Sequence, residues 1–193
     1  MTTVYTQCDE ILRRLKELDR PAVNLLRPGL PSASIRSSAC GLDIVFPTCI
    51  IDLYQWRDGT EEGKASFGDM GIFPGFFLLS LAKAIETRND LLRISHPWRS
   101  CWLPFLSNGA GGFYGINCHS APTEDGEICE YITGDTEVHI LFSSLGVMLR
   151  SIIVCFDRKI FYISEDGGFE ADDLRFEEVA NECNCISLKD SCR

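Results

Sequence analysis

The strongest constraint on the fold is a series of four short apolar runs between residues 102 and 142, separated by turn-forming residues. The runs are WLPFLS, FYGINC, EICEYI and VHILF, and they are separated by NGAGG, HSAPTEDG and a turn at Gly134-Asp135. Glycine, asparagine and aspartate favour the backbone conformations that reverse a chain between paired strands. The pattern therefore predicts antiparallel strands joined by short connections.

Helical periodicity precedes and follows this β region. Amphipathic helices are expected over residues 5–19 and over FPTCIIDLYQWRDG, which begins near Pro47 and ends at Asp58-Gly59. Ser32 is predicted to cap a short helix that ends at Gly41, and a polar loop is expected from Thr60 to Gly71.

The remaining elements complete the prediction of an α+β fold. FFLLSL reads as a strand, Ser80 as the cap of the helix LAKAIETRNDLLRI, SSLGVMLRSIIVCF as a helix and KIFYIS as an edge strand. We expect one domain over residues 1–193, with a central, mostly antiparallel sheet packed with helices. The N-terminal helix and the acidic segment 165–193 would be extensions of it.

Composition places the chain among ordinary globular proteins, with 45% apolar and 24% charged residues. No apolar run is long enough to span a bilayer, and the start MTTVYTQCDEILRRLKELDR lacks the pattern of a secretory signal. We therefore expect a cytoplasmic protein that does not bind membranes. The ten cysteines are expected to be free thiols that pack as small apolar side chains.

The net charge of −10 is concentrated near the C-terminus. Between Glu165 and Glu182 there are eight acidic residues and one basic residue, Arg175. Such a negative field disfavours nucleic acids and anionic membranes, and it accelerates encounter with a basic protein. The alternative reading is a solvated helix face that keeps the protein soluble.

The two glycine-rich stretches do not fit phosphate-binding motifs. In NGAGG, Gly109 and Gly111 match the dinucleotide fingerprint, but Tyr114 stands at its third glycine and a strand follows instead of a helix. GTEEGKA is one residue shorter than a P-loop and has Ala65 where a hydroxyl is needed. NGAGG is thus interpreted as a turn, no cofactor is expected, and no catalytic residue is assigned because nucleophile and zinc-protease motifs are absent.

One metal-site alternative stays open. Cys118, His119, Cys129 and His139 could meet across neighbouring strands and bind zinc, although scattered thiols on strands more often serve packing. We predict no metal.

The predicted partner-binding surface consists of acidic residues in or beside loops, because loops on a rigid scaffold commonly carry recognition. These residues are Asp58, Glu61, Glu62, Asp69, Glu124, Asp125 and Glu127.

The chain resembles the SUKH superfamily, which includes fungal cell-wall assembly regulators and many bacterial immunity proteins. The resemblance spans residues 40–155 and includes FPGFFLLSLAKA, WLPF, the glycines of NGAGG with Tyr114, and the serine pair before the last predicted helix. Asn117-Cys118-His119 departs from the pattern, because the superfamily usually has an acidic residue there.

The resemblance implies an α+β fold that acts by binding other proteins and has no catalytic residues. Many members neutralise toxins, often nucleases, so we expect an immunity protein whose partner is a toxin with a basic surface. A regulatory scaffold of the cell-wall assembly regulator type is the alternative, and a metal- or thiol-dependent enzyme is the less favoured third reading.

Overall fold

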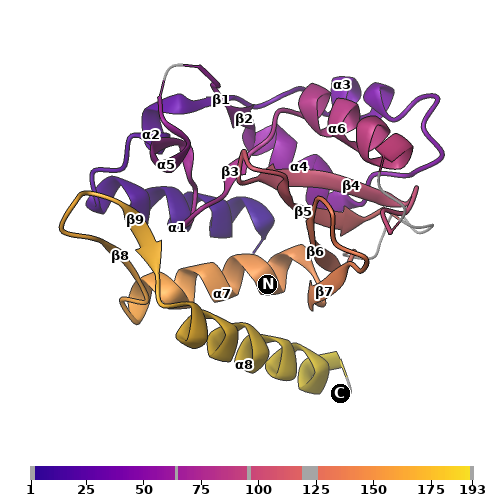
Figure 1. Cartoon of the computed structure of the whole chain (residues 1–193). Coiled ribbons are helices and arrows are strands. Elements are labelled where there is room, and N and C mark those ends of the chain that lie inside the picture. The colour runs from indigo at the N-terminus through magenta and orange to yellow at the C-terminus, as the bar shows by residue number, and fades with distance from the viewer. Residues whose placement is uncertain (1–2, 64, 95–96, 119–125, 192–193) are drawn as a thin grey trace.

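A five-stranded antiparallel sheet forms the centre of the fold, with helices on both of its faces (Figure 1). The computed structural model describes residues 3–63, 65–94, 97–118 and 126–191, with side chains up to residue 185. The strands follow one another across the sheet in sequence order, as a meander. They are β3 (Phe77–Leu78), β4 (Trp102–Ser107), β5 (Gly112–Asn117), β6 (Ile128–Ile132) and β7 (His139–Phe142).

The four runs that the sequence marks as strands are all found in this sheet. Ser107 pairs with Phe113 across the NGAGG connection, and Tyr114 pairs with Glu130 on the next strand. The expected strand at FFLLSL is reduced to the two residues of β3. The predicted α+β fold, with a central antiparallel sheet in a single domain, is confirmed.

Each helix expected from apolar periodicity is present, and two of the serine caps can be seen directly. The backbone N–H of Lys83 donates to Ser80 Oγ at 3.2 Å, and that of Val147 donates to Ser144 Oγ at 3.2 Å. These hydrogen bonds satisfy N–H groups that have no partner inside the helix. The helices are α1 (Val4–Glu17), α2 (Ala22–Leu25), α3 (Ser32–Ser38), α4 (Thr48–Trp56), α5 (Phe67–Met70), α6 (Leu81–Ile94), α7 (Leu145–Asp157) and α8 (Asp173–Ser191).

Two local predictions were wrong. Pro31, not Ser32, is the residue before α3, and no side chain caps that helix. The expected polar loop 60–71 begins inside a strand, because β2 (Arg57–Thr60) pairs with β1 (Leu26–Pro28), and it contains α5. Pairing with a segment some thirty residues earlier in the chain decides this region, and local composition does not reveal that pairing.

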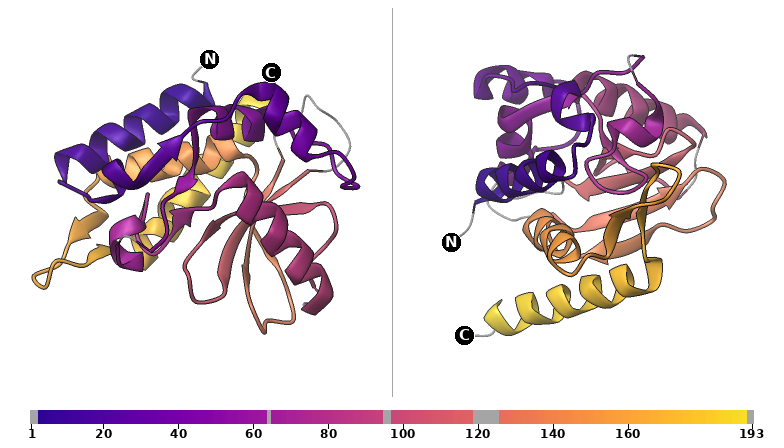
Figure 2. Two further views of the ribbon diagram at one scale, coloured as in Figure 1. Left: turned by 90° about the horizontal axis from the view of Figure 1, so that it is seen from above. Right: turned by 90° about the vertical axis from the view of Figure 1, so that its left-hand side faces the viewer.

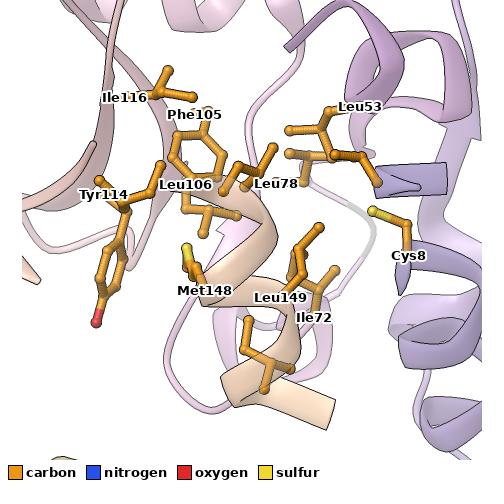
Figure 3. Packing of buried hydrophobic residues seen from close by; sticks show 14 of the residues in the cluster. Cys8, Leu53, Ile72, Leu78, Phe105, Leu106, Tyr114, Ile116, Met148 and Leu149 are labelled. Atoms are coloured by element: carbon orange, nitrogen blue, oxygen red, sulfur yellow. The ribbon is translucent and has the colours of Figure 1, made fainter. Parts of the chain in front are cut away.

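Two hydrophobic clusters hold the sheet between its helices. Residues of α1, α4 and α7 meet the sheet in the larger cluster, where Cys8, Leu53, Leu106 and Met148 are buried (Figure 3). The smaller cluster lies on the opposite face and joins Leu91 of α6 to Trp98, Trp102, Cys129 and Tyr131.

The C-terminal part of the chain forms a hairpin and a long helix beside this core. β8 (Phe161–Ile163) pairs with β9 (Phe169–Ala171), and α8 then packs across α7 at an angle (Figure 2). Val179 and Cys183 of α8 are buried in the larger cluster, as Leu15 of α1 is. None of the helices in the described part of the chain combines the length and apolar character needed to cross a membrane.

Candidate functional site

The NGAGG turn uses its own backbone N–H groups. Asn108 Oδ1 accepts hydrogen bonds from the N–H groups of Ala110 and Gly112, both at 2.8 Å, and Ser107 Oγ accepts from Gly109 at 3.1 Å. Gly109 and Gly111 have φ values of 74° and 93°, which residues with a side chain rarely adopt. Since these N–H groups already have partners within the turn, a phosphate would have to displace them. The interpretation of NGAGG as a turn between two strands is confirmed.

The four residues of the possible zinc site are not gathered in one place as far as the structure describes them. Cys129 is buried in the smaller cluster, whereas His139 is exposed and pairs with Glu130, whose side chain lies on the opposite face of the sheet. Among the described residues, no three histidine, cysteine or acidic side chains form a metal-binding group, and His119 lies outside them. Burial raises the pKa of Cys118 and of Cys129 to about 12, which keeps both thiols protonated and weakly nucleophilic at neutral pH.

Asp58 has a structural role in the fold. Its side chain is buried, and Oδ1 accepts a hydrogen bond from the backbone N–H of Leu81 at 2.8 Å, at the start of α6. Arg27 forms an ion pair with its other oxygen at 3.6 Å. Asp58 therefore connects β2 to α6 and has little surface to offer a partner.

The other predicted site residues are spread over separate places. Glu62 is exposed after β2, Glu127 is exposed before β6, and Glu61 is half-buried. Asp69 of α5 accepts a hydrogen bond from Ser66 Oγ, at the start of that helix, at 2.7 Å. Glu124 and Asp125 lie outside the described residues. The structure thus does not bring the predicted acids that it describes together into one site.

A concave surface, here called the acidic groove, lies between the central sheet and the C-terminal hairpin and helix. It has a volume of about 610 Å³, within the range of about 300–1,000 Å³ that is typical of ligand pockets. Its described lining includes four acidic residues and no basic one. The residues of the acidic groove are Phe73, Pro74, Gly75, Phe76, Tyr114, Glu130, Leu141, Phe161, Glu170, Ala171, Asp173, Phe176 and Glu177.

Aromatic rings form the floor of the acidic groove. The rings of Phe76 and Tyr114 meet edge to face, with their centroids 4.5 Å apart. Phe73 lies beside both Phe161 and Phe176, with 6.4 Å between ring centroids in each case. The Tyr114 hydroxyl points away from the packed residues Phe105 and Leu106 (Figure 3). The floor is therefore an apolar surface continuous with the core.

A carboxylate is held at the base of the acidic groove. Glu130 is hydrogen-bonded to the side chain of Tyr114, its cross-strand neighbour. Burial raises the pKa of Glu130 above its usual 4.5, while the nearby His139 acts in the opposite direction. A carboxylate in this position is only partly hydrated, and a cation placed beside it would stabilise its ionised form.

Two arginines in the C-terminal part of the chain make contacts outside the acidic groove. Arg175 donates a hydrogen bond to the backbone oxygen of Arg158, and Arg158 forms an ion pair with Glu182. Within the described part of the chain, no lysine or arginine forms a salt bridge with Glu130, Glu170, Asp173 or Glu177. The carboxylates of the acidic groove therefore retain their negative field.

Sequence reasoning located this site only in part. The negative cluster between Glu165 and Glu182 contains Glu170, Asp173 and Glu177, which line the groove. Glu130 was missed, although an acidic residue inside the apolar run EICEYI was a signal that could have identified it. The five aromatic residues of the floor were indistinguishable from core residues in sequence.

The fold and this site define a class: an α+β protein with an acidic, aromatic-floored groove and no gathered metal-binding or nucleophilic groups among its described residues. The family model described as SMI1 / KNR4 family (SUKH-1) matches residues 41–151, more than half of the chain. The chain belongs to this family, whose members are in general binding modules and not enzymes. No curated protein matches the chain significantly.

Proposed function

We propose that this chain is a cytoplasmic immunity protein, which binds a toxin with a basic surface and thereby neutralises it. The observation that carries the proposal is the acidic groove, which combines four carboxylates with an aromatic floor on a fold used for binding. The cytoplasmic location is supported by the nine described cysteines, all of which are free thiols.

Electrostatics favour a basic protein over the other macromolecules considered. A surface with a net charge of −10 repels phosphate backbones and anionic lipids, and it accelerates encounter with a positively charged patch. Nuclease toxins fit this requirement, because the surfaces that bind their nucleic-acid substrates are basic. The exposed acids Glu62 and Glu127 are proposed as further contacts, together with Glu61, Asp69, Glu124 and Asp125.

A regulatory scaffold of the cell-wall assembly regulator type is the second candidate, because the family match fits it as well as the immunity role. In that case the partner would be a host enzyme, and losing the chain would change a host process without protecting against a toxin.

Affinity capture and a toxicity assay separate the two candidates. Tagged full-length protein is used to capture partners from the native host, and each captured protein is then produced alone and together with this chain. We expect one basic partner that arrests growth when produced alone and is harmless when the chain is co-produced.

Two charge variants test the role of the acidic surface in the same assay. Glu130→Gln/Glu177→Gln removes two groove carboxylates, and Glu86→Gln/Glu165→Gln removes two exposed acids outside the groove. Protection should be weakened by the first pair and kept by the second. A captured partner that is a non-toxic host enzyme would contradict the immunity role and support the scaffold.

A further inference from the structure

We infer that the acidic groove binds a single arginine side chain projecting from the partner, and that the C-terminal extension selects for it. The inference rests on the proposed function and names the chemical group that the partner would insert. Its basis is the composition of the two walls of the groove and the chemistry of the guanidinium group.

The two walls come from different parts of the chain. Phe73, Phe76, Tyr114, Glu130 and Leu141 belong to residues 41–151, which match the family model. The opposite wall lies beyond residue 151, in β8, β9 and α8, and consists of Phe161, Glu170, Ala171, Asp173, Phe176 and Glu177. Three of the four groove carboxylates are thus supplied by the extension that the family model does not match.

The aromatic rings and the carboxylates of the acidic groove are together complementary to a planar cation. Phe76 and Phe176 are partly exposed in the groove, so their ring faces can stack with a guanidinium group. Glu130 lies at the base, hydrogen-bonded to Tyr114, and Asp173 and Glu177 lie one helical turn apart on α8. Arginine has five donors in a fixed plane and is weakly hydrated, whereas the ammonium group of lysine is a compact and strongly hydrated charge.

The lining of the acidic groove is unsuited to anionic groups and to uncharged apolar side chains. No described basic residue lines it, so a carboxylate or phosphate group would find no counter-ion there. An uncharged apolar side chain would cover the carboxylates without pairing them, which costs free energy. Arginine satisfies both surfaces, since its methylene stem packs on the rings while its head pairs with the acids.

The test uses the full-length ¹⁵N-labelled protein and three small probes. Nα-acetyl-arginine amide, Nα-acetyl-lysine amide and Nα-acetyl-citrulline amide are titrated separately, and binding is followed by the shifts of backbone amide resonances. We expect the arginine probe to shift resonances around Phe76, Tyr114, Glu130 and Phe176. The lysine probe should bind more weakly, and the citrulline probe, which has the same shape without the charge, should not shift them.

Matched variants assign the shifts to the groove. Glu130→Gln/Glu177→Gln should weaken binding of the arginine probe by about tenfold, because each charge-assisted hydrogen bond contributes substantially. Glu86→Gln/Glu165→Gln should bind the probe like the unchanged protein. Spectra that stay the same outside the groove show that both variants fold.

Three results would overturn the inference: equal shifts with citrulline, equal binding by lysine, or shifts spread over the exposed acids outside the groove. If the arginine probe binds but no toxin is captured, the groove assignment stands and the immunity role fails. If a toxin is neutralised equally by both charge variants, the immunity role stands and the groove assignment fails.

Discussion

At the scale of single residues, Asp58 illustrates how an acid next to a loop can belong to the core of the fold. Its carboxylate accepts the hydrogen bond from Leu81 N–H and pairs with Arg27, so it holds the N-terminus of α6. Asp58 and the exposed Glu62 are both acidic and only four positions apart in the chain, but Asp58 is buried. Burial therefore gives Asp58 a structural role at the start of α6, whereas Glu62 remains on the surface.

Replacing Asp58 tests this structural role. Asp58→Ala should lower the free energy of unfolding by about 1–3 kcal/mol, because a buried N–H and an arginine lose their partner. Asp58→Asn keeps an acceptor for Leu81 N–H and should cost less. Urea denaturation of both variants measures the difference, and equal stability of Asp58→Ala and the unchanged protein would contradict the assignment.

Glu130 should show an unusual titration. Because burial raises its pKa above 4.5, the cost of holding it ionised is present at neutral pH and is relieved as the pH falls through the raised value. NMR titration of the side-chain carboxyl should therefore give a pKa above 4.5, and the arginine probe should lower it. A pKa at or below 4.5 without the probe would contradict the described surroundings of Glu130.

The thiols should differ sharply in reactivity. Cys40 and Cys185 are exposed, whereas burial raises the pKa of Cys118 and Cys129 to about 12. Iodoacetamide at neutral pH should label the exposed pair first, and it should label the buried pair only after unfolding, as peptide mass mapping can measure. Rapid labelling of Cys118 in the folded protein would instead support a thiol-dependent enzyme.

At the scale of elements, the outer edge of β7 is covered by one side chain of α8. Asn184 Oδ1 accepts from the backbone N–H of Ser143 at 2.9 Å, and its Nδ2 donates to the backbone oxygen of Leu141 at 2.8 Å. The amide thus pairs with the edge of the sheet as a peptide group of another strand would. Uncovered edges are prone to pair with other chains.

Asn184→Ala should expose this edge. We expect a loss of about 1–3 kcal/mol in the free energy of unfolding, from two lost hydrogen bonds, together with more dimer in light scattering. Asn181→Ala, at an exposed position of the same helix, is the matched control and should change neither quantity. Unaltered stability and a monomeric Asn184→Ala variant would show that the edge needs no cover.

Helices and strands that depend on their local sequence were predicted correctly, and strands that depend on a distant partner were not. β4, β5 and β6 are bounded by turn residues, and α1, α6 and α7 have clear apolar faces, so the local sequence was sufficient for them. β1, β2 and β9 have only three or four residues each. Such short strands exist through pairing with a partner strand, which no local pattern reveals.

At the scale of the whole molecule, the segments outside the family match are part of one core. Leu15 of α1 and Val179 of α8 are each 1% exposed, in the same cluster as residues of the sheet and α7. The N-terminal helix and C-terminal helix are therefore expected to unfold together with the matched region and not as separate units.

Calorimetry can test whether the terminal helices unfold cooperatively with the matched region. The unchanged protein should show a single thermal transition, and Leu15→Ala should destabilise it by about 2–5 kcal/mol through the cavity left behind. Val179→Ala should shift the same single transition in the same direction. A separate low-temperature transition in Val179→Ala would show that α8 unfolds independently of the core.

The sequence by itself determined the strand meander, the main helices, the NGAGG turn and the acidic character of the C-terminal segment. These depend on neighbours in the chain: glycines that permit positive φ, serines that cap helices, and apolar residues at regular spacing. Only the tertiary structure decided which acids line the acidic groove, because the groove joins residues from Phe73 to Glu177. Folding brings these distant residues together and buries Asp58, and neither outcome is encoded in the spacing of residues along the chain.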